Sequence, residues 1–479
     1  MLFHSLQFAI FFPIVFGLYH VLPHTLQNRM LLVASYVFYG AWDWRYCSLL
    51  LISTVTDYFC GLGLARTDDA PPKRRKPFVL ISVLVNLSLL GVFKYYDFFA
   101  TEFQDLMGAF GLSVQPYFLN VVLPIGISFY TFQTMSYTID VYRRKVDAAE
   151  NFFDFALYVS FFPQLIAGPI ERGTRLLPQI LKPRTVKAAM MQRGAYFFVW
   201  GLFLKVFIAD NMAAIVDPVF AATGDYEGGQ VLLAVYAFSF QIYCDFAGYS
   251  FMAIGLAQSM GITLMENFRR PYFSRNIGDF WRRWHISLSS WFRDYVFSPF
   301  YLYIEHLNWV RTFPFKVRHG IAFFGTLVVA EYMLGLWHGA AWTFGLFGLY
   351  HAFMIWGYYY VRTWWDKMNP YVQIFLTYHV ACGGWLIFRV NDMDQAVDMF
   401  KSLFVNFNIS NPVLADMGLK IIAFNAILII VQVFQDWKKD TVIVLRLPVF
   451  LQLTFLVFIV SLTMVFGDFS DRPFIYFQF

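Results

Sequence analysis

Residues 320–361 read GIAFFGTLVVAEYMLGLWHGAAWTFGLFGLYHAFMIWGYYYV, where Glu331 is the only acidic or basic residue besides two histidines. A hydrocarbon core about 30 Å thick is crossed by roughly 20 apolar residues in a helix. The stretch is therefore long enough for two crossings, which we predict at 320–338 and 340–361. Helices are expected because lipid cannot satisfy the hydrogen bonds of an open backbone.

The composition of the whole chain supports the same interpretation. Of 479 residues, 59% are hydrophobic and 14% are charged, whereas a soluble domain carries about 25% charged residues. No linker or repeat divides the sequence, so we expect one membrane domain over residues 1–479. The predicted fold is an all-α polytopic membrane protein with about 10–13 transmembrane helices plus re-entrant and interfacial helices. The candidate spans are 6–22, 30–43, 47–65, 77–98, 117–139, 194–216, 230–252, 320–338, 340–361, 371–389, 419–435 and 448–467.

The first apolar run, from Leu6, has no Lys or Arg before it and no small-residue cleavage site after it. We therefore expect an uncleaved span and no signal peptide. Basic residues gather at 66–76, 143–145 and 438–439, while 101–116 and 217–229 carry only acidic charges. By the positive-inside rule the basic loops are cytoplasmic and the acidic loops are external. Counting outward from these loops predicts both termini on the external side.

One apolar segment breaks this alternation. Residues 152–170 are flanked on both sides by basic residues, and they contain Pro163, Gly168 and Pro169. A run that enters and leaves on one side is a re-entrant segment, and broken backbone is tolerated at depth only where protein or water covers it. A missed span or a surface helix is the alternative interpretation.

The densest concentration of charge is at 267–296, NFRRPYFSRNIGDFWRRWHISLSSWFRDYV, where six arginines are opposed by two aspartates. From Phe280 onward the apolar residues recur at helical spacing, which predicts one amphipathic helix at the cytoplasmic interface. Its arginines are suited to anionic lipid headgroups or to a phosphate-rich ligand such as a coenzyme A thioester. Both interpretations stay open.

Two histidines are the candidate catalytic residues. His285 lies in this basic segment, and His338 lies within the apolar stretch, where ionisable residues are costly and usually face a cavity. Gly335 and Gly339 flank His338 and would let another backbone or a substrate come close. Glu331 falls on the same helical face, and His351 is a third buried candidate. A hydrogen-bonded packing role is the alternative for His338.

Three further polar residues lie within predicted spans. Gln133, Tyr137 and Asp245 are candidates for lining a cavity, although interhelical hydrogen bonds would explain the first two equally well. Asp245 is an intramembrane acid, for which we expect a function or a basic partner. The aromatic segment 474–479 either docks into the bundle or meets a partner.

Two motifs, WRRWHISLSS at 281–290 and LWHGAAW at 336–342, resemble the signature regions of the membrane-bound O-acyltransferase (MBOAT) family. Other stretches are similar to its bacterial alginate O-acetyltransferase branch. They are PIGISFYTFQTMSYTIDVY at 124–142, FFPQLIAGPIER at 161–172, DFAGYS at 245–250 and FIYFQF at 474–479.

The resemblance implies a catalytic role for His338, with His285 at the position of its partner, which is His or Asn in different branches of the family. It implies an MBOAT-type fold in which cytosolic and external funnels meet near the histidines. The activity expected is transfer of an acyl group, acetyl first of all, from a cytosolic thioester donor such as acetyl-coenzyme A to a cell-envelope or secreted polysaccharide. An imidazole serves as base or nucleophile near neutral pH, and His285 would polarise the thioester carbonyl or orient the donor.

From the same resemblance we expect the bacterial inner membrane as location and an external SGNH-type or related transferase as partner. An acyl-carrier protein is a further possible partner, and no nucleic acid, bound cofactor or metal is expected. The donor-binding candidates are Arg282, Arg283, Trp284, Ser287 and Trp337. Two alternatives stay open, a D-alanyl transferase of the teichoic-acid type and a transporter without chemistry of its own. The lack of an internal repeat argues against the transporter.

Overall fold

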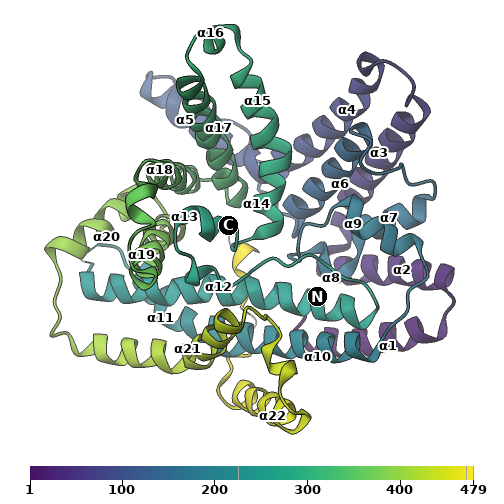
Figure 1. Ribbon diagram of the computed structural model, residues 1–479. Coiled ribbons are helices and arrows are strands. Elements are labelled where there is room, and N and C mark those ends of the chain that lie inside the picture. Colours follow the sequence, from purple (N-terminus) through teal and green to yellow (C-terminus); the bar gives the residue numbers. More distant parts are fainter. Residues whose placement is uncertain (225, 471, 478–479) are drawn as a thin grey trace. The chain divides into compact units, whose positions relative to one another are not determined.

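The computed structural model describes residues 1–224, 226–470 and 472–477, and within them every regular element is helical (Figure 1). The prediction of an all-α protein is confirmed. The chain forms two compact units. One consists of Met1–Phe198 and Tyr249–Met265, and the other of Val199–Gly248 and Glu266–Phe479. The single membrane domain over residues 1–479 stays a prediction.

The first unit contains the N-terminal helices. They are α1 (Leu6–Val21), α2 (His24–Asp43), η1 (Trp44–Tyr46), α3 (Cys47–Arg66), α4 (Pro72–Leu90), η2 (Gly91–Tyr95), α5 (Tyr96–Ala109), α6 (Ile127–Tyr142), α7 (Phe152–Ser160), α8 (Phe162–Leu165), α9 (Gly173–Leu181) and the first part of α10 (Ala188–Leu202). Helices α3, α4 and α6 are joined by a buried polar network around Asp57, whose carboxylate accepts hydrogen bonds from Ser82, Asn86 (2.6 Å) and Thr138 (2.5 Å). Such satisfied polar groups hold helices together where apolar packing alone gives little specificity.

Eight helical stretches within the described residues are long and apolar enough to cross a membrane. They are His24–Arg66, Pro72–Ala109, Ala188–Ala221, Gly228–Ser259, Phe315–His338, Pro370–Arg389, Pro412–Lys438 and Val449–Phe466. The predicted spans 30–43 and 47–65 both lie in the first of them, and the first predicted span is the shorter helix α1. The predicted span 340–361 is helical but is not among the eight, because α18 ends in a polar aromatic stretch.

Two predicted segments differ from the structure in an informative way. The predicted span 117–139 is helical only from Ile127, because Pro124 cannot continue a helical ladder and Gly126 adopts a left-handed φ of 78°. The segment 152–170 is broken, as predicted, into α7 and α8, and neither is long enough to span. The basic loops before α4 and after α6 also meet, since Asp68 pairs with Arg75 (3.3 Å) and Arg144 (2.8 Å).

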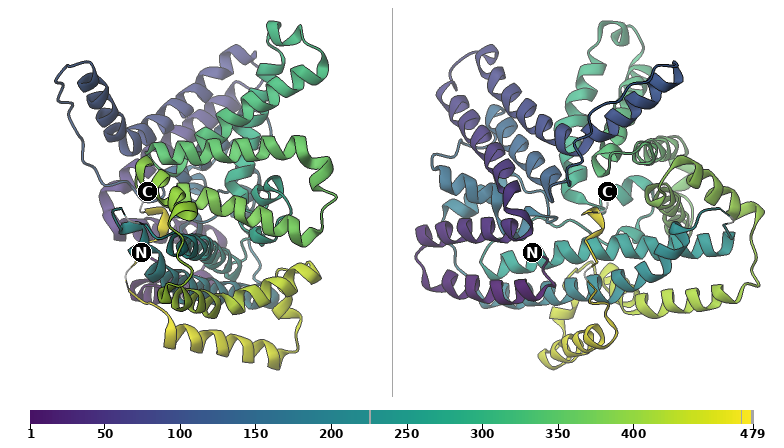
Figure 2. Two further views of the ribbon diagram at one scale, coloured as in Figure 1. Left: turned by 90° about the vertical axis from the view of Figure 1, so that its left-hand side faces the viewer. Right: turned by 180° about the vertical axis from the view of Figure 1, so that it is seen from behind.

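The second unit contains the remaining elements (Figure 2). They are η3 (Phe203–Ala209), α11 (Asp210–Ala221), most of α12 (Gly228–Ser259), η4 (Pro271–Phe273), α13 (Ile277–Trp281), α14 (Ile286–Phe292), η5 (Arg293–Phe297), α15 (Ser298–Glu305), α16 (Asn308–Arg311), α17 (Phe315–His338), α18 (Trp342–Trp365), α19 (Pro370–Arg389), α20 (Met393–Val405), α21 (Pro412–Lys438), η6 (Ile443–Arg446), α22 (Val449–Phe466) and η7 (Ile475–Phe477).

Helices α17 and α18 pack directly against each other, and the contact is made by glycines. A Cβ at Gly335 would lie 3.0 Å from the nitrogen of Gly348, and one at Gly339 would overlap the Phe344 ring. The absence of a side chain lets the two backbones approach closely at Gly335, as the sequence predicted, and leaves room for the Phe344 ring at Gly339. This packing fixes the end of α17, where His338 is the last helical residue.

Candidate active site

The two candidate catalytic histidines lie at helix boundaries in the second unit. His338 ends α17 and is buried, and His285 is fully buried between α13 and α14. His285 adopts a left-handed backbone, with φ 42° and ψ 53°. The single amphipathic helix predicted from Phe280 is therefore wrong. Its backbone turns away because Arg269 N donates to Arg283 O (2.9 Å) and Ile286 N donates to Asn267 O (2.9 Å).

Aromatic rings bring the two histidines into one cluster. The ring of Trp337 lies 5.7 Å from that of His285 and 5.0 Å from that of His338. The ring of Tyr476 is 6.4 Å from His285 and 5.4 Å from His338. Residues from the chain's middle and its C-terminal segment thus surround both imidazoles.

His285 is held in a defined environment. Its Nδ1 lies 3.1 Å from Oδ1 of Asn267, which also accepts a hydrogen bond from the hydroxyl of Ser287 (2.9 Å). The ring of Phe246 meets the imidazole edge to face at 4.6 Å. Burial lowers the pKa of His285 to about 3. The imidazole is therefore neutral at physiological pH.

His351, the third candidate, does not join this pair. It packs against Trp281 at 5.1 Å and Phe347 at 4.6 Å, and its ring fills the space left by Gly384 on α19. Neither ring nitrogen has a hydrogen-bond partner among the described residues. His351 therefore packs among aromatic rings, apart from the cluster that holds the other two histidines.

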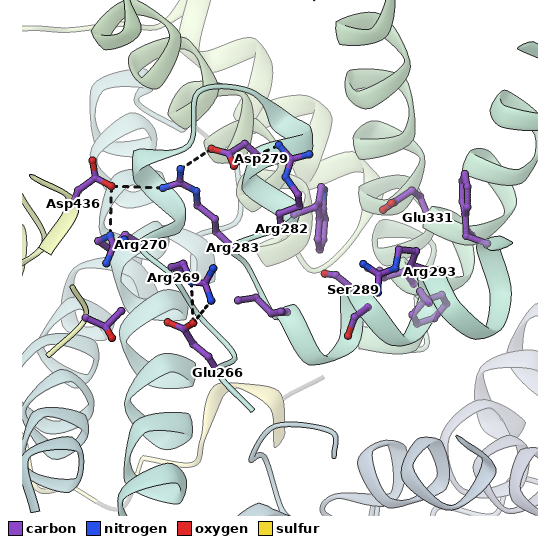
Figure 3. A pocket seen from close by; sticks show the side chains of 18 of the residues that line it. Glu266, Arg269, Arg270, Asp279, Arg282, Arg283, Ser289, Arg293, Glu331 and Asp436 are labelled. Carbon is purple, nitrogen blue, oxygen red and sulfur yellow. Dashed lines mark hydrogen bonds and ion pairs between the residues drawn. The ribbon is translucent and has the colours of Figure 1, made fainter. Parts of the chain in front are cut away.

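A cavity of about 990 Å³ opens beside this cluster in the second unit (Figure 3). It is lined by Glu266, Arg269, Arg270, Asp279, Trp281, Arg282, Arg283, Ile286, Ser289, Ser290, Phe292, Arg293, Phe297, Ala330, Glu331, Leu334, Asp436, Lys439, Asp440 and Thr441. The basic segment 267–296 and the basic end of α21, both predicted to be cytoplasmic, thus line one cavity.

The arginines of this cavity are held by carboxylates. Arg283 lies 2.9 Å from Asp279 and 3.9 Å from Asp436, which also holds Arg270 at 3.5 Å (Figure 3). The lining has six basic and five acidic residues, so it is close to neutral overall. Recognition of an anion would therefore depend on guanidinium N–H groups that are not engaged in these ion pairs. Arg282 is the best placed, since its side chain is 70% exposed.

The cavity reaches the helix that carries His338. Ala330, Glu331 and Leu334 of α17 line it. Leu334 precedes His338 by one helical turn, a rise of roughly 6 Å at 1.5 Å per residue. A ligand that fills the cavity would therefore lie within about a turn of the histidine.

The predicted donor-binding residues separate into two groups. Arg282 and Arg283 line the cavity. Trp284, Ser287 and Trp337 are buried and do not line it. Trp284 packs against Trp385 at 4.7 Å, while Ser287 and Trp337 contact the histidine cluster through Asn267 and His285.

The predicted cavity-lining residues are engaged in hydrogen bonds. In the first unit, Gln133 donates to Tyr158 O (2.6 Å) and the Tyr137 hydroxyl accepts from Ala149 N (2.8 Å). In the second, Asp245 forms an ion pair with Lys205 at 2.9 Å. The basic partner expected for Asp245 is thus a lysine.

The C-terminal segment docks within the second unit. For the residues described, this decides between the two alternatives that the sequence left open, docking into the bundle and meeting a partner. Lys205 also pairs with Asp210 (2.8 Å), and Asp245 Oδ2 accepts the backbone N–H of Ile475 at 2.7 Å. Upstream, Asn211 donates to Phe466 O (2.9 Å) and Asp468 N donates to Val206 O (3.1 Å). Residues 478 and 479 of the predicted aromatic segment lie outside the described residues.

Sequence reasoning missed two residues of this site. Asn267 has no motif of its own. Lys205 had a signal, because a lone lysine inside an apolar run is costly unless it is paired.

Comparisons with known proteins bear on the family to which this chain belongs. Residues 143–391, which include both histidines, match the model of "MBOAT, membrane-bound O-acyltransferase family". The chain is 40% identical over 403 residues to a probable alginate O-acetylase of Pseudomonas putida, covering 82% of this chain and 78% of that protein. It is 32% identical over 428 residues to a peptidoglycan O-acetyltransferase of Helicobacter pylori, covering 82% and 77%.

A teichoic acid D-alanyltransferase of Bacillus subtilis is 30% identical over 287 residues, covering 56% of this chain and 69% of that protein. This likeness is weaker and shorter than the other two. A family match over half of the chain, together with relatives aligned over most of its length, leaves one conclusion. The chain belongs to the membrane-bound O-acyltransferase family.

Proposed function

We propose that this acyltransferase moves an acetyl group from a cytosolic thioester donor, acetyl-coenzyme A, across the membrane for O-acetylation of a cell-envelope or secreted polysaccharide. The observation that carries the proposal is the position of His338, one helical turn from a cavity lined by Arg282 and Arg283. The relatives in Pseudomonas putida and Helicobacter pylori, named for O-acetylation of alginate and of peptidoglycan, support acetyl as the group and a polysaccharide as the acceptor.

The chemistry needs one proton acceptor close to the reacting carbonyl. His338 takes the proton of the attacking hydroxyl, the new C–O bond forms as the C–S bond breaks, and the proton ends on the leaving thiol. A positioned base of this kind contributes roughly 10²–10⁴-fold to the rate. In a second route, His338 Nε2 or Nδ1 carries the acetyl group between donor and acceptor.

The orientation proposed places the cavity on the cytoplasmic side of the bacterial inner membrane and both termini on the external side. It is supported by Lys439 and the arginines of segment 267–296, which line the cavity together. An external SGNH-type or related transferase would complete delivery to the polysaccharide.

The test is His338→Ala in the full-length chain, with polysaccharide acetylation measured in cells and release of coenzyme A measured with the purified protein. We expect both activities to be lost while thermal unfolding in detergent is unchanged. His319→Ala is the matched control, because His319 lies on the same helix and contacts Tyr301 instead of the cluster. Retained acetylation in His338→Ala would reject the proposal. Turnover of a D-alanyl carrier protein, without turnover of acetyl-coenzyme A, would favour the teichoic-acid alternative.

A further inference from the structure

The side chain of Asn267 has an orientation that the hydrogen bonds around it determine. Three groups converge on its Oδ1: the Ser287 hydroxyl at 2.9 Å, the Ser287 backbone N–H at 3.3 Å and His285 Nδ1 at 3.1 Å. A backbone N–H can only donate, so the atom that faces it must be the amide oxygen.

This orientation sets the tautomer of His285. An amide oxygen only accepts, so the Nδ1 atom of His285 must carry the proton. In a neutral imidazole the other nitrogen, Nε2, is then the one with the lone pair. His285 is thus an acceptor at Nε2, and it cannot polarise a thioester carbonyl by donating from that atom. Of the two roles expected for His285 from the sequence, polarising the thioester carbonyl is therefore disfavoured, and orienting the donor is kept.

The backbone around Asn267 makes the arrangement rigid. Ile286 N donates to Asn267 O at 2.9 Å, and Arg269 N donates to Arg283 O at 2.9 Å. These two bonds clamp the turn in which His285 has its left-handed φ of 42°. A strained backbone persists only where its surroundings hold it in place. Asn267 holds both the backbone and the imidazole.

The residue type also matters. Asn267 and His285 are both buried. A carboxylate at position 267 would stabilise the imidazolium, whereas an amide orients the ring and adds no charge. The surroundings therefore keep His285 neutral and oriented at the same time.

We propose that Asn267 is a positioning residue, which fixes the Nδ1–H tautomer of His285 and so makes Nε2 a hydrogen-bond acceptor in acyl transfer. The inference rests on the proposed function, because it assumes that His285 takes part in the chemistry. Asn267 acts through His285 and need not touch either substrate.

The test uses the full-length protein in detergent or nanodiscs, with acetyl-coenzyme A as the probe and release of coenzyme A measured between pH 5.5 and 9. We expect Asn267→Ala to lower kcat on the order of 100-fold, which is the cost of misplacing a group that orients the reacting atoms, and to leave KM within about threefold because the donor cavity is intact. Asn425→Ala is the matched control, since Asn425 is a fully buried asparagine of the same unit that bonds Ile421 O.

Asn267→Asp separates positioning from simple packing. The introduced carboxylate still orients the ring but raises the pKa of His285, so kcat should fall toward the acidic end of this pH range and recover as the pH rises. The parent protein should lack this limb. Tyr476, which contacts His285, and His338, which contacts Tyr476, are the same in both proteins, and so is the ion pair of Asp245 with Lys205.

The results distinguish a failure of the inference about Asn267 from a failure of the proposed role of His285. A normal kcat in Asn267→Ala, or a pH profile of Asn267→Asp parallel to that of the parent, would overturn the inference. If Asn267→Ala unfolds, the pH profile of Asn267→Asp alone decides. Full turnover in His285→Ala would instead remove the proposed role of His285, which is a different failure.

Discussion

Ile475 donates its backbone N–H to the carboxylate of Asp245 at 2.7 Å, and the next residue places its ring against both histidines. Asp245 is in turn held by Lys205 at 2.9 Å. A buried ion pair on α12 and η3 thus anchors the segment that completes the aromatic cluster.

Replacing Asp245 should release this segment. In Asp245→Leu the N–H of Ile475 loses its acceptor and Lys205 keeps only Asp210, so we expect acetyl transfer to fall at least about tenfold and stability to drop by roughly 3–5 kcal/mol. Asp245→Asn keeps an acceptor and should lose less. Asp416→Leu is the control, because its exposed pair with Lys420 (2.8 Å) lies within α21 and should contribute about 1 kcal/mol or less. Equal activity of all three variants would contradict the anchor. Transfer assays and thermal unfolding measure the two effects.

The hydroxyl of Tyr476 is the next feature to test. It is buried without a hydrogen-bond partner among the described residues, which typically costs about 1–3 kcal/mol. Tyr476→Phe removes that cost and keeps the ring, so we expect equal or higher thermal stability together with lower acetyl transfer. Tyr476→Ala should lower both. Full activity of Tyr476→Phe would show that only the ring matters.

The cavity arginines should govern donor affinity. Charge-assisted hydrogen bonds contribute about 1.5–3 kcal/mol, so Arg282→Ala and Arg283→Ala should each raise KM for acetyl-coenzyme A roughly tenfold or more, with kcat changed less. Arg362→Ala is the control, because Arg362 stacks on Tyr359 and does not line the cavity. The measurement is initial rate against donor concentration. An unchanged KM would place the donor elsewhere.

The buried carboxyl of Glu171 should make the stability of the first unit depend on pH. Burial raises the pKa of this carboxyl to about 7 from its usual 4.5, and its side chain accepts a hydrogen bond from Met265 N. The protonated carboxyl of Glu171 therefore contributes its full stabilisation below about pH 4.5. This contribution, on the order of 3 kcal/mol, is lost as the pH rises through about 7. Glu171→Gln cannot ionise and should lose less stability between pH 5 and 8. Thermal unfolding across that pH range measures the loss of stability in the parent protein and in Glu171→Gln. If stability falls equally with pH in both proteins, the prediction for Glu171 is wrong.

Much of the fold could be predicted because helices that cross lipid need long apolar runs with few charges, and these are visible in the sequence. The histidines were identified because each lies in a distinctive motif. The break at His285 could not be predicted, since Phe280, Trp284 and Leu288 keep helical spacing across it and a left-handed φ leaves no mark on that pattern. Asn267 and Lys205 were missed because their roles depend on contacts with residues distant in sequence, at His285 and Asp245.

The left-handed backbone at position 285 restricts which side chains this position accepts during evolution. Among residues other than glycine, Asn, Asp and His tolerate a positive φ best. The two that the resemblance assigns to this position in different branches, His and Asn, both belong to that set. A sequence selected only for stability would place glycine here, so the imidazole is kept at the expense of conformational strain. Substitution at 285 is therefore filtered first by backbone geometry and then by chemistry, which leaves few ways for this site to diversify.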